Sequence, residues 1–375
     1  MAMKQWMGAL AVVVVLSAHA HANSWQIESL ATPANENRIA LDPSGQPHIV
    51  YESGPTLHHI AWTGSGWHDD GVSSGDVHSP RIAIGADGTV HVAYSIWWQQ
   101  THVLNQMWHA SFDGTAWAKE MVGDWTGRLS LALDASGEPH ISNDVDSMVF
   151  DAQGTAHYAR TNWLGGANWE IRYGVSGQAE VVVRNVDGAP LDLKLAVDSA
   201  GIAHLTYHTG GDALYYVFGR EASWTYEKIS GGVAGAFTGL AVDEAGTPHV
   251  SFEYCHGPSS PEKPKELWYG VRKDGVWYME TIDTAENLYP GGGMPNIRCG
   301  QSTDLVLDSL GRAYISYDFW NGTGAPELRY AAGPEPAPPP VPEPLTILSA
   351  LLGTAALGGY IRRRLREARA EIACG

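Results

Sequence analysis

The chain has 375 residues and carries 41 acidic against 23 basic residues, a net charge of −18. So acidic a protein repels nucleic acid and anionic lipid headgroups, which excludes both as expected partners. The sequence also has no GxSxG, Walker-type glycine loop, HExxH or paired CxxC motif, so acyl transfer, nucleotide binding and zinc chemistry lack a signature.

Residues 1–22 are predicted to form a cleaved secretory signal peptide. Lys4 precedes an apolar run from Gly8 to Leu16, and small residues follow up to Ala22, with cleavage after Ala20 or Ala22. Without this segment and the C-terminal residues 342–375, 17 basic and 38 acidic residues remain, a net charge of −21. This balance fits a soluble exported protein.

One repeated unit fills the body of the chain, residues 23–333. Seven copies share an apolar residue, Asp or Gly, two residues, Gly, two residues, and His or Tyr: LDPSGQPH, IGADGTVH, LDASGEPH, FDAQGTAH, VDSAGIAH, VDEAGTPH and LDSLGRAY. A short apolar strand precedes each copy and an alternating strand follows it, so the Asp-x-x-Gly between them is a tight turn. A third strand and a Trp-bearing fourth complete each unit. Four antiparallel strands per repeat predict an all-β fold, a β-propeller.

The number of blades and the closure of the ring follow from the spacing. Successive repeat glycines are 43 to 65 residues apart, except Gly137 and Gly154, which are 17 apart. We interpret this step as an irregular third blade with an extra hairpin, which gives six blades; seven blades, one of them degenerate, is the alternative. The last copy has no fourth strand, and residues 24–30 match the fourth-strand pattern of residues 223–229. The N-terminal strand should therefore close the last blade.

Over residues 24–330 this pattern resembles secreted bacterial propellers and, loosely, sialidase-like folds. The Asp-box of those enzymes, Ser-x-Asp-x-Gly-x-Thr-Trp, is absent in that form. The resemblance implies a fold and no particular activity, because propellers include hydrolases, lyases, lectins and scaffolds.

Residues that recur in every copy are expected to be structural. The histidines should bond the turns, the aromatic residues three positions later should pack between blades, and the fourth-strand tryptophans should cover the outer strands. The three sets are His48, His91, His140, His157, His204 and His249; Tyr51, Tyr94, Tyr207, Phe252 and Tyr317; and Trp67, Trp117, Trp224 and Trp277. Function is expected where the copies differ.

We name the end of the ring with the Asp-x-x-Gly turns the bottom face and the opposite end the top face. Counted from the turn Asp, positions −4 and +10 are expected to lie opposite each other near the top of the channel. These pairs are Arg38 with Glu52, Arg81 with Ser95, Ser130 with Asp144, Lys194 with His208, Gly239 with Glu253, and Asp304 with Asp318.

These positions supply the candidate site residues. Arg38, Arg81 and Lys194, with His208, suit a carboxylate or sulfate ligand. The candidates for acid–base chemistry are Glu52, Glu253, Asp304 and Asp318. The same residues, Glu52, Glu253 or the pair Asp304 and Asp318, are also candidate calcium ligands, and no other cofactor is expected. The alternative is that Arg38 and Glu52 form a mere cross-strand ion pair.

Aromatic residues beside amides and charges mark the top loops. Trp97, Trp98, Tyr289 and Trp320 are candidates for stacking on sugar rings, and the alternative is that they are packed loop hydrophobes. Cys255 and Cys299, in insertions on the same face, are predicted to form a disulfide, because the protein is exported and the third cysteine, Cys374, lies in the tail.

The C-terminal residues have a distinctive order. A Pro-rich linker, 334–341, leads to Pro342, Glu343 and Pro344, then an apolar run of 17 residues, 345–361, and an arginine cluster, 362–366. The apolar run is at the lower limit for crossing a bilayer, and the arginines should stay cytoplasmic. The alternative is an ordinary membrane anchor on a proline-rich stalk.

Residues 342–369 resemble the PEP-CTERM sorting signal. The resemblance implies that the secretion machinery and an exosortase are partners, and that the enzyme cuts the chain at the outer face of the inner membrane. The segment would insert as a transmembrane helix only transiently. The protein would then reach the surface or extracellular matrix of a Gram-negative bacterium that makes exopolysaccharide.

The sequence therefore favours an exported propeller that binds a carbohydrate-like or extracellular-matrix ligand, such as an exopolysaccharide or other glycan, on its top face. One alternative is a glycoside hydrolase or polysaccharide lyase that uses the central carboxylates, and another is a surface scaffold with no small ligand. A deep pocket of carboxylates and arginines would favour the enzyme, whereas an aromatic shelf would favour binding.

Overall fold

The computed structural model describes residues 24–97, 105–209, 213–229, 233–255, 264–286 and 297–335. The chain divides into two units, 1–334 and 335–375, and the account below concerns the first. No helix among the described residues is long and apolar enough to cross a membrane. The predicted signal peptide, linker residues 336–341 and the sorting signal lie outside the described residues.

The described residues form strands and no helices, which confirms the all-β prediction. The strands make seven antiparallel sheets, six with four strands and one with two. Sheet one is β2 (Asn35–Leu41), β3 (Pro47–Ser53), β4 (Thr56–Trp62) and β5 (Trp67–Ser74); sheet two is β6 (Val77–Ile84), β7 (Val90–Ile96), β8 (Gln106–Phe112) and β9 (Trp117–Asp124); sheet three is β10 (Ser130–Leu133) and β11 (Pro139–Ser142). Sheet four is β12 (Ser147–Phe150), β13 (Ala156–Gly165), β14 (Asn168–Val175) and β15 (Val181–Asp187); sheet five is β16 (Pro190–Val197), β17 (Ala203–Thr209), β18 (Ala213–Arg220) and β19 (Ser223–Lys228). Sheet six is β20 (Val233–Val242), β21 (Pro248–Cys255), β22 (Lys265–Lys273) and β23 (Val276–Ala285); sheet seven is β24 (Arg298–Leu307), β25 (Ala313–Trp320), β26 (Glu327–Ala332) and β1 (Gln26–Ala31).

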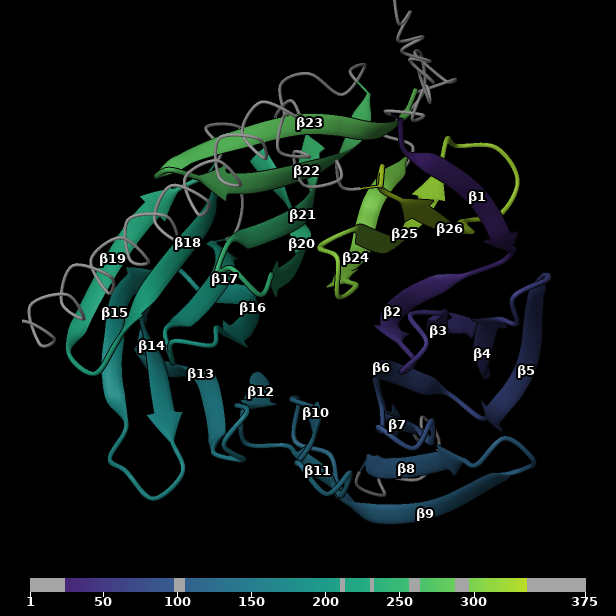
Figure 1. Ribbon diagram of the computed structural model, residues 1–375, viewed down its shortest axis with the longest axis horizontal. Coiled ribbons are helices and arrows are strands. Elements are labelled where there is room, and N and C mark those ends of the chain that lie inside the picture. The colour runs from purple at the N-terminus through teal and green to yellow at the C-terminus, as the bar shows by residue number, and fades with distance from the viewer. Residues whose placement is uncertain are drawn as a thin grey trace, which may run out of the picture. The chain divides into compact units, whose positions relative to one another are not determined.

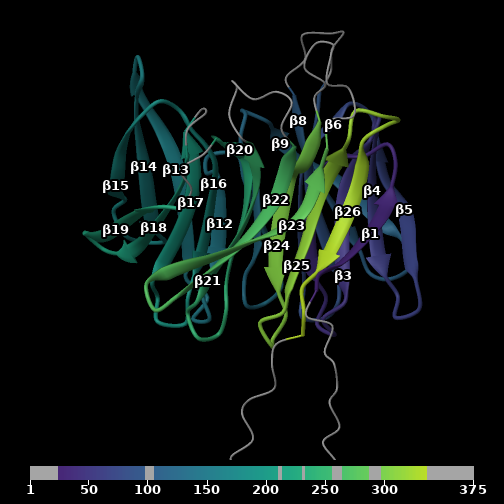
Figure 2. The same cartoon turned by 90° about the horizontal axis from the view of Figure 1, so that it is seen from above.

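The innermost strands of the seven sheets form a closed ring. β2, β6, β10, β12, β16, β20 and β24 contact one another in this order, and β24 contacts β2 (Figure 1). Figure 2, turned by 90°, shows the strands running between the two ends of the ring. The prediction of six blades is therefore wrong, and the seven-blade alternative is confirmed. The reason is that β10 and β11 pair only with each other and hold a position of their own, while β12 begins a separate sheet.

The N-terminal strand closes the ring as predicted. β1 pairs with β26 at the outer edge of sheet seven, with Gln26 opposite Ala332 and Glu28 opposite Tyr330. The last blade is thus assembled from both ends of the repeat region, which leaves no incomplete sheet at the join.

The repeated turns are built from local hydrogen bonds. The Asp42 carboxylate accepts the backbone N–H groups of Ser44 and Gln46, both at 2.8 Å, and Gly45 has a φ of 81° that favours glycine. The repeat histidine reaches back to the same aspartate, as in His157 with Asp151 at 3.0 Å. The predicted bond is confirmed for His140, His157 and His204. His48 and His249 lie 3.8 and 3.6 Å from their aspartates, and His91, whose copy has Gly85 at that position, bonds His109 instead.

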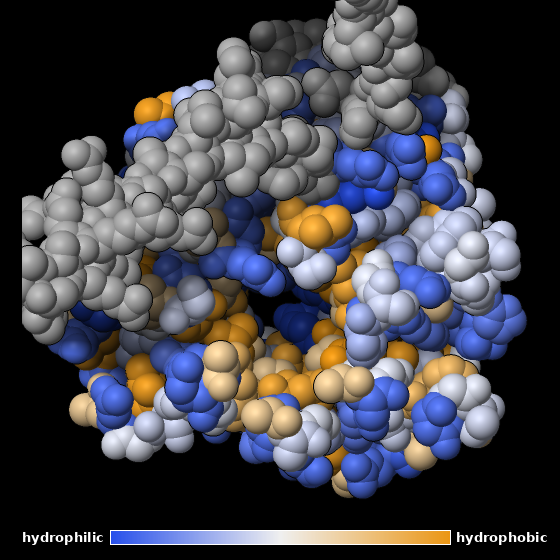
Figure 3. Space-filling view, viewed as in Figure 1, coloured by the Kyte–Doolittle hydropathy of each residue, from blue (hydrophilic) through white to orange (hydrophobic). Residues whose placement is uncertain are grey.

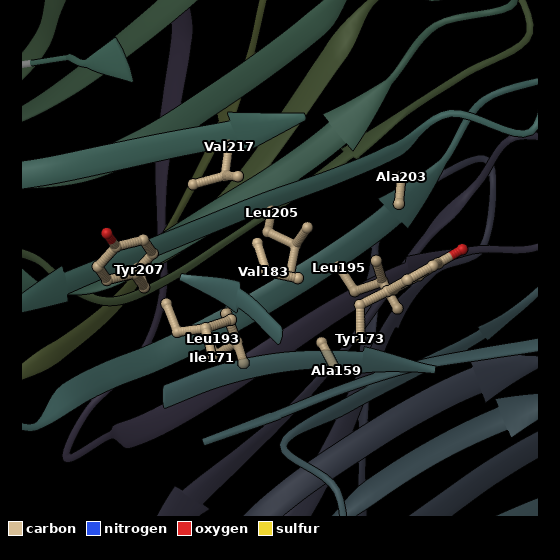
Figure 4. Packing of buried hydrophobic residues seen from close by; sticks show 10 residues of the cluster. All are labelled: Ala159, Ile171, Tyr173, Val183, Leu193, Leu195, Ala203, Leu205, Tyr207 and Val217. Carbon is tan, nitrogen blue, oxygen red and sulfur yellow. The ribbon is translucent and has the colours of Figure 1, made fainter. Parts of the chain in front are cut away.

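Adjacent sheets pack through apolar faces. Ile171 and Val183 of sheet four meet Leu193, Leu195 and Leu205 of sheet five in one buried cluster (Figure 4). The repeat aromatic residues are buried as predicted: Tyr51, Tyr94, Tyr207, Phe252 and Tyr317.

Tryptophans at or beside the start of the fourth strands join five of the seven sheets to the sheet before them. Each indole packs edge-on against a third-strand ring of the preceding sheet, with centroids 4.9 to 5.4 Å apart. The pairs, here called the tryptophan latches, are Trp25 with Tyr269, Trp67 with Tyr330, Trp117 with His59, Trp224 with Tyr173, and Trp277 with Tyr216.

Candidate functional site

A cavity of about 500 Å³, here called the central cavity, lies among the innermost strands. Residues of, or directly before, all seven of these strands line it, and charged side chains alternate with serines and apolar residues along its wall. The space-filling view shows a hollow near the middle of the ring of sheets, with hydrophilic residues deep inside it (Figure 3). The central cavity lies toward the top ends of the strands, away from the repeated turns.

Irregular pairing in the innermost strands shapes the central cavity wall. The register shifts near the top of β2, β6, β16 and β24, each time between positions −7 and −4. Position −6 at these four places has a positive φ although none of the residues is glycine: Glu36, Ser79, Asp192 and Ser302. All four line the central cavity. Such backbone costs roughly 1–3 kcal/mol per residue and gathers at functional sites, which makes this wall a candidate site.

The predicted pairing of positions −4 and +10 is wrong. Each turn begins with a pair at positions −1 and +5, such as Leu41 with Pro47, so position −4 lies opposite position +8. Arg38 therefore lies opposite Val50, and Lys194 lies opposite Thr206. The −4 residues nevertheless reach the central cavity as expected, namely Arg38, Arg81, Ser130, Lys194 and Asp304.

Two arginines in the central cavity have few hydrogen-bond partners. The Arg38 guanidinium donates to the backbone oxygen of Asn37 at 2.6 Å, and that of Arg81 donates to the oxygen of Pro80 at 2.9 Å. Among the described residues, no carboxylate forms an ion pair with either guanidinium, and Arg38 Nε is buried without a hydrogen-bond partner. Their strands, β2 and β6, are neighbours in the ring. Both groups are thus available to an anion.

Lys194 adds a third positive charge. Its Nζ lies 3.5 Å from Asp304 of sheet seven and 3.9 Å from Asp192. Gly239 of sheet six occupies the −4 position between them, and a Cβ there would come within 2.7 Å of Leu305. Sheet six therefore presents no side chain at this level, which leaves room for the contact between sheets five and seven.

Burial and mutual repulsion perturb the cations of the central cavity, which carboxylates also line. Burial, followed by the positive charge of Arg38, lowers the pKa of Arg81 to about 10 and also lowers the pKa of Lys194. A cation whose pKa falls in this way is destabilised in its charged form, and an anion placed beside it reverses that effect. Perturbed charges of this kind are typical of functional sites.

The carboxylates in the central cavity wall are all engaged. Glu36 accepts the N–H of Ser79 at 2.9 Å, Asp192 that of Thr238 at 2.5 Å, and Asp304 that of Ile39 at 3.2 Å, each on the next sheet of the ring. Asp146 accepts the N–H of Thr161 at 2.6 Å and pairs with Arg128 Nε at 3.1 Å. These groups therefore hold the sheets together at the top of the ring.

Glu36, Asp192 and Arg128 were not predicted as site residues. Glu36 and Asp192 stand two positions before Arg38 and Lys194, and residues two apart share one face of a strand. The alternation of side chains along β2 and β16 could therefore have indicated that Glu36 and Asp192 face the same cavity as Arg38 and Lys194. Arg128 precedes the two-stranded sheet, whose separate position the sequence did not show.

The candidate carboxylates at position +10 lie between sheets and do not line the central cavity. Asp318 accepts the Asn37 amide at 2.8 Å and lies 3.9 Å from Arg298, and Glu253 lies 3.3 Å from Lys265. Burial raises the pKa of Asp318 to about 7 and that of Glu52 to about 9. His208 is likewise buried, within β17. Of the four catalytic candidates, the central cavity contains only Asp304.

The described aromatic candidates are packed near the top face. Trp97 packs on His78 and Trp125, with centroids 4.3 and 5.3 Å apart, and the Trp320 indole donates to the oxygen of Thr323 at 3.1 Å. Neither lines the central cavity, and Trp97 is 37% exposed, so it is only partly packed. Trp98 and Tyr289 lie outside the described residues.

The predicted disulfide is not formed, because Cys255 and Cys299 are both free thiols. Cys255 ends β21, opposite Lys265, whereas Cys299 lies in β24 of the next sheet, opposite Phe319. The Glu253 side chain lies beside both cysteines and accepts the Cys299 N–H at 3.4 Å. Burial, with the Glu253 charge second, raises the pKa of the Cys255 thiol to about 12, so this thiol is protonated at neutral pH.

No family model and no curated protein matches this chain. A solved structure of a protein of unknown function from Dyadobacter fermentans is similar, with a TM-score of 0.55 and 15% identity over 84% of this chain and 98% of its own. A lectin from Aleuria aurantia, solved with Fucα1-6GlcNAc, has a TM-score of 0.47 and 10% identity over 84% and 100% of the two chains. A Trypanosoma rangeli sialidase, solved with the inhibitor DANA, has a TM-score of 0.48 and 8% identity over 88% and 58%. The first likeness supports the fold, and none bears on function.

Proposed function

We propose that this protein binds an anionic, carbohydrate-like ligand in its central cavity, through a carboxylate or sulfate group. The observation that carries the proposal is the pair of neighbouring guanidiniums, Arg38 and Arg81, which face one cavity without a carboxylate partner among the described residues. Guanidinium groups bind carboxylate and sulfate with two parallel hydrogen bonds, which gives direction as well as charge.

The rest of the central cavity suits a sugar acid. Ser79, Ser130 and Ser147 bring hydroxyl groups to its wall, and Ile82 and Leu193 add apolar surface. Its volume of about 500 Å³ lies in the range of small-molecule sites. The ligand's charge would be held by the arginines while its hydroxyls exchange hydrogen bonds with the serines.

Calorimetric titration of the purified protein with galacturonate, and with galactose as the neutral control, tests the proposal. Arg81→Ala should weaken galacturonate binding by about tenfold or more, since a hydrogen bond to a charged group contributes roughly 1.5–3 kcal/mol. Arg220→Ala, at an exposed arginine, is the matched control. Binding should also weaken as salt is added. Equal affinity for galactose, or an unchanged Arg81→Ala variant, would contradict the proposal.

A hydrolase or lyase is the second candidate, because the central cavity combines carboxylates with arginines. The bonds of these carboxylates to backbone N–H groups and cations favour binding over turnover, since groups so engaged are poor proton carriers. Incubation with polygalacturonate and a count of new reducing ends decides between the two. Activity that is lost in Asp304→Asn would make this protein an enzyme.

We propose further that the protein is exported and sorted to the cell envelope. The support is the order of the sequence outside the described residues: a signal-like N-terminus and, at the other end, Pro342, Glu343 and Pro344 before an apolar run and arginines. An acidic polysaccharide outside the cell would then be within reach of the central cavity.

A further inference from the structure

A second cavity of about 720 Å³, here called the lateral cavity, adjoins the central cavity. Gly127, Arg128 and Met148 line both of them, so these residues lie between the two spaces. The Arg128 guanidinium is fixed at the junction by Asp146 at 3.1 Å and by the backbone oxygen of Thr161 at 2.5 Å.

The lateral cavity exists because sheet three stops after two strands. Along β13, His157 and Ala159 are buried, and Ala159 packs in the cluster shared with sheet five. Tyr158 and Arg160 alternate with them and therefore point to the other side, toward sheet three. Third and fourth strands of sheet three would cover this side, and their absence leaves it open as the wall of the lateral cavity.

The lining of the lateral cavity has the chemistry of a sugar site. The Tyr158 ring lies over its cross-strand neighbour Gly174, where an added Cβ would come within 2.2 Å of the ring. One face of the ring is thus supported by backbone. Beside it, Arg160 forms a two-pronged pair with Glu180 at 2.8 and 2.7 Å, and the Asn143 amide is held by the Asp124 oxygen at 2.8 Å. A supported aromatic ring among fixed planar polar groups suits stacking and hydrogen bonding of a pyranose.

We infer that the lateral cavity is a subsite for further sugar units of a linear acidic polysaccharide whose first acidic unit occupies the central cavity. This inference rests on the proposed function and names its ligand class, a chain rather than a single sugar. The two cavities are adjacent and share three lining residues, which places two binding sites side by side as a chain of linked units requires. Arg128 is paired with Asp146 and Arg160 with Glu180, so the acidic groups of the polymer are expected to be held mainly by Arg38 and Arg81, and the lateral cavity would bind the sugar rings.

Titration with galacturonate oligomers of one to six units tests the inference. Affinity should rise by about tenfold or more between one unit and the longer oligomers, because the added units reach Tyr158. Tyr158→Ala should remove this gain and leave the affinity for the single unit unchanged. Tyr158→Phe, which keeps the ring, should keep the gain. Arg81→Ala should weaken every length by the same factor. Melting curves of each variant verify that it is folded.

The outcomes separate this inference from the proposed function. If the wild type binds one unit and all longer oligomers with the same affinity, the lateral subsite is wrong and the central site stands. If oligomer binding depends on Tyr158 but not on Arg81, the lateral subsite stands and the central site is wrong. If no galacturonate of any length binds, both are wrong. The comparison of oligomer lengths in the wild type tests the lateral subsite even if the Tyr158→Ala variant fails to fold.

Discussion

Replacing Asp318 by Asn should change how stability depends on pH. Asp318 is 1% exposed, and burial raises the pKa of its carboxyl group to about 7 from an ordinary value of 3.8. The folded protein therefore holds this proton more tightly than the unfolded chain does. The resulting stabilisation is fully present below pH 3.8 and is lost as the pH rises through 7. The variant keeps an oxygen that can accept the Asn37 amide but has no proton to lose.

The size of the effect follows from the shift. One pKa unit corresponds to roughly 1.4 kcal/mol, and most of the loss due to Asp318 falls between pH 5 and pH 7. From pH 5 to pH 9 the wild type should lose about 3 kcal/mol of unfolding free energy that Asp318→Asn retains. Glu52, whose pKa burial and then the charge of Glu36 raise to about 9, adds a loss of the same sign up to pH 9. Glu52 is present in both proteins, and the Asp318 charge is only the last-named cause of its raised pKa, so the difference between the proteins is due mainly to Asp318.

Urea unfolding of both proteins at half-unit steps from pH 5 to pH 9 measures this difference. Glu52→Gln is the companion variant, and it should flatten the curve up to pH 9. Buried histidines with lowered pKa values, such as His59 and His204, reduce stability below pH 6.5, but equally in wild type and variant. Parallel pH profiles for wild type and Asp318→Asn would refute the reasoning. They would mean that Arg298, 3.9 Å away, keeps the carboxylate ionised.

Three further predictions concern the ring and the termini. Deletion of residues 24–30 should expose β26 and cause unfolding or aggregation, and an unchanged melting temperature would contradict this. His204→Ala should lower stability by about 2 kcal/mol, because His204 bonds Tyr216 at 2.6 Å inside sheet five, and should leave galacturonate affinity as it was; loss of affinity at full stability would be the opposite result. Intact mass of surface-extracted protein should show the loss of residues 362–375, and retention of Cys374 would disprove processing.

The repeat predicted the local structure well and the long-range arrangement less well. Turns such as Asp42 to Gln46 are fixed by bonds within five residues, so their pattern can be seen in the sequence. Strand β1 was also predictable, because its pattern matched a copy elsewhere in the chain. The short step to Gly154 was ambiguous, since only the neighbours in the ring decide whether a hairpin joins a sheet or stands alone.

The site was predictable in the same partial way. Position −4 could be singled out because its residues differ between copies of the repeat. Three of these residues, Arg38, Arg81 and Lys194, reach the central cavity. Glu52 and Asp318 do not reach it, because the register of each hairpin and the irregular pairing near its top move position +10 between the sheets. The lateral cavity had no signal in any single residue, because it arises from strands that sheet three lacks.

The tryptophan latches have a mechanical consequence. They fasten five of the seven joints in the ring, and the two joints on either side of sheet three have none among the described residues. A closed ring of sheets is expected to open first where the contacts between sheets are weakest. Slow opening motions should therefore be concentrated at β10 to β13, where the described residues include no tryptophan latch. Met148 of this segment lines both cavities. The short sheet that leaves room for the lateral cavity would therefore also make this side of the ring the easiest to deform.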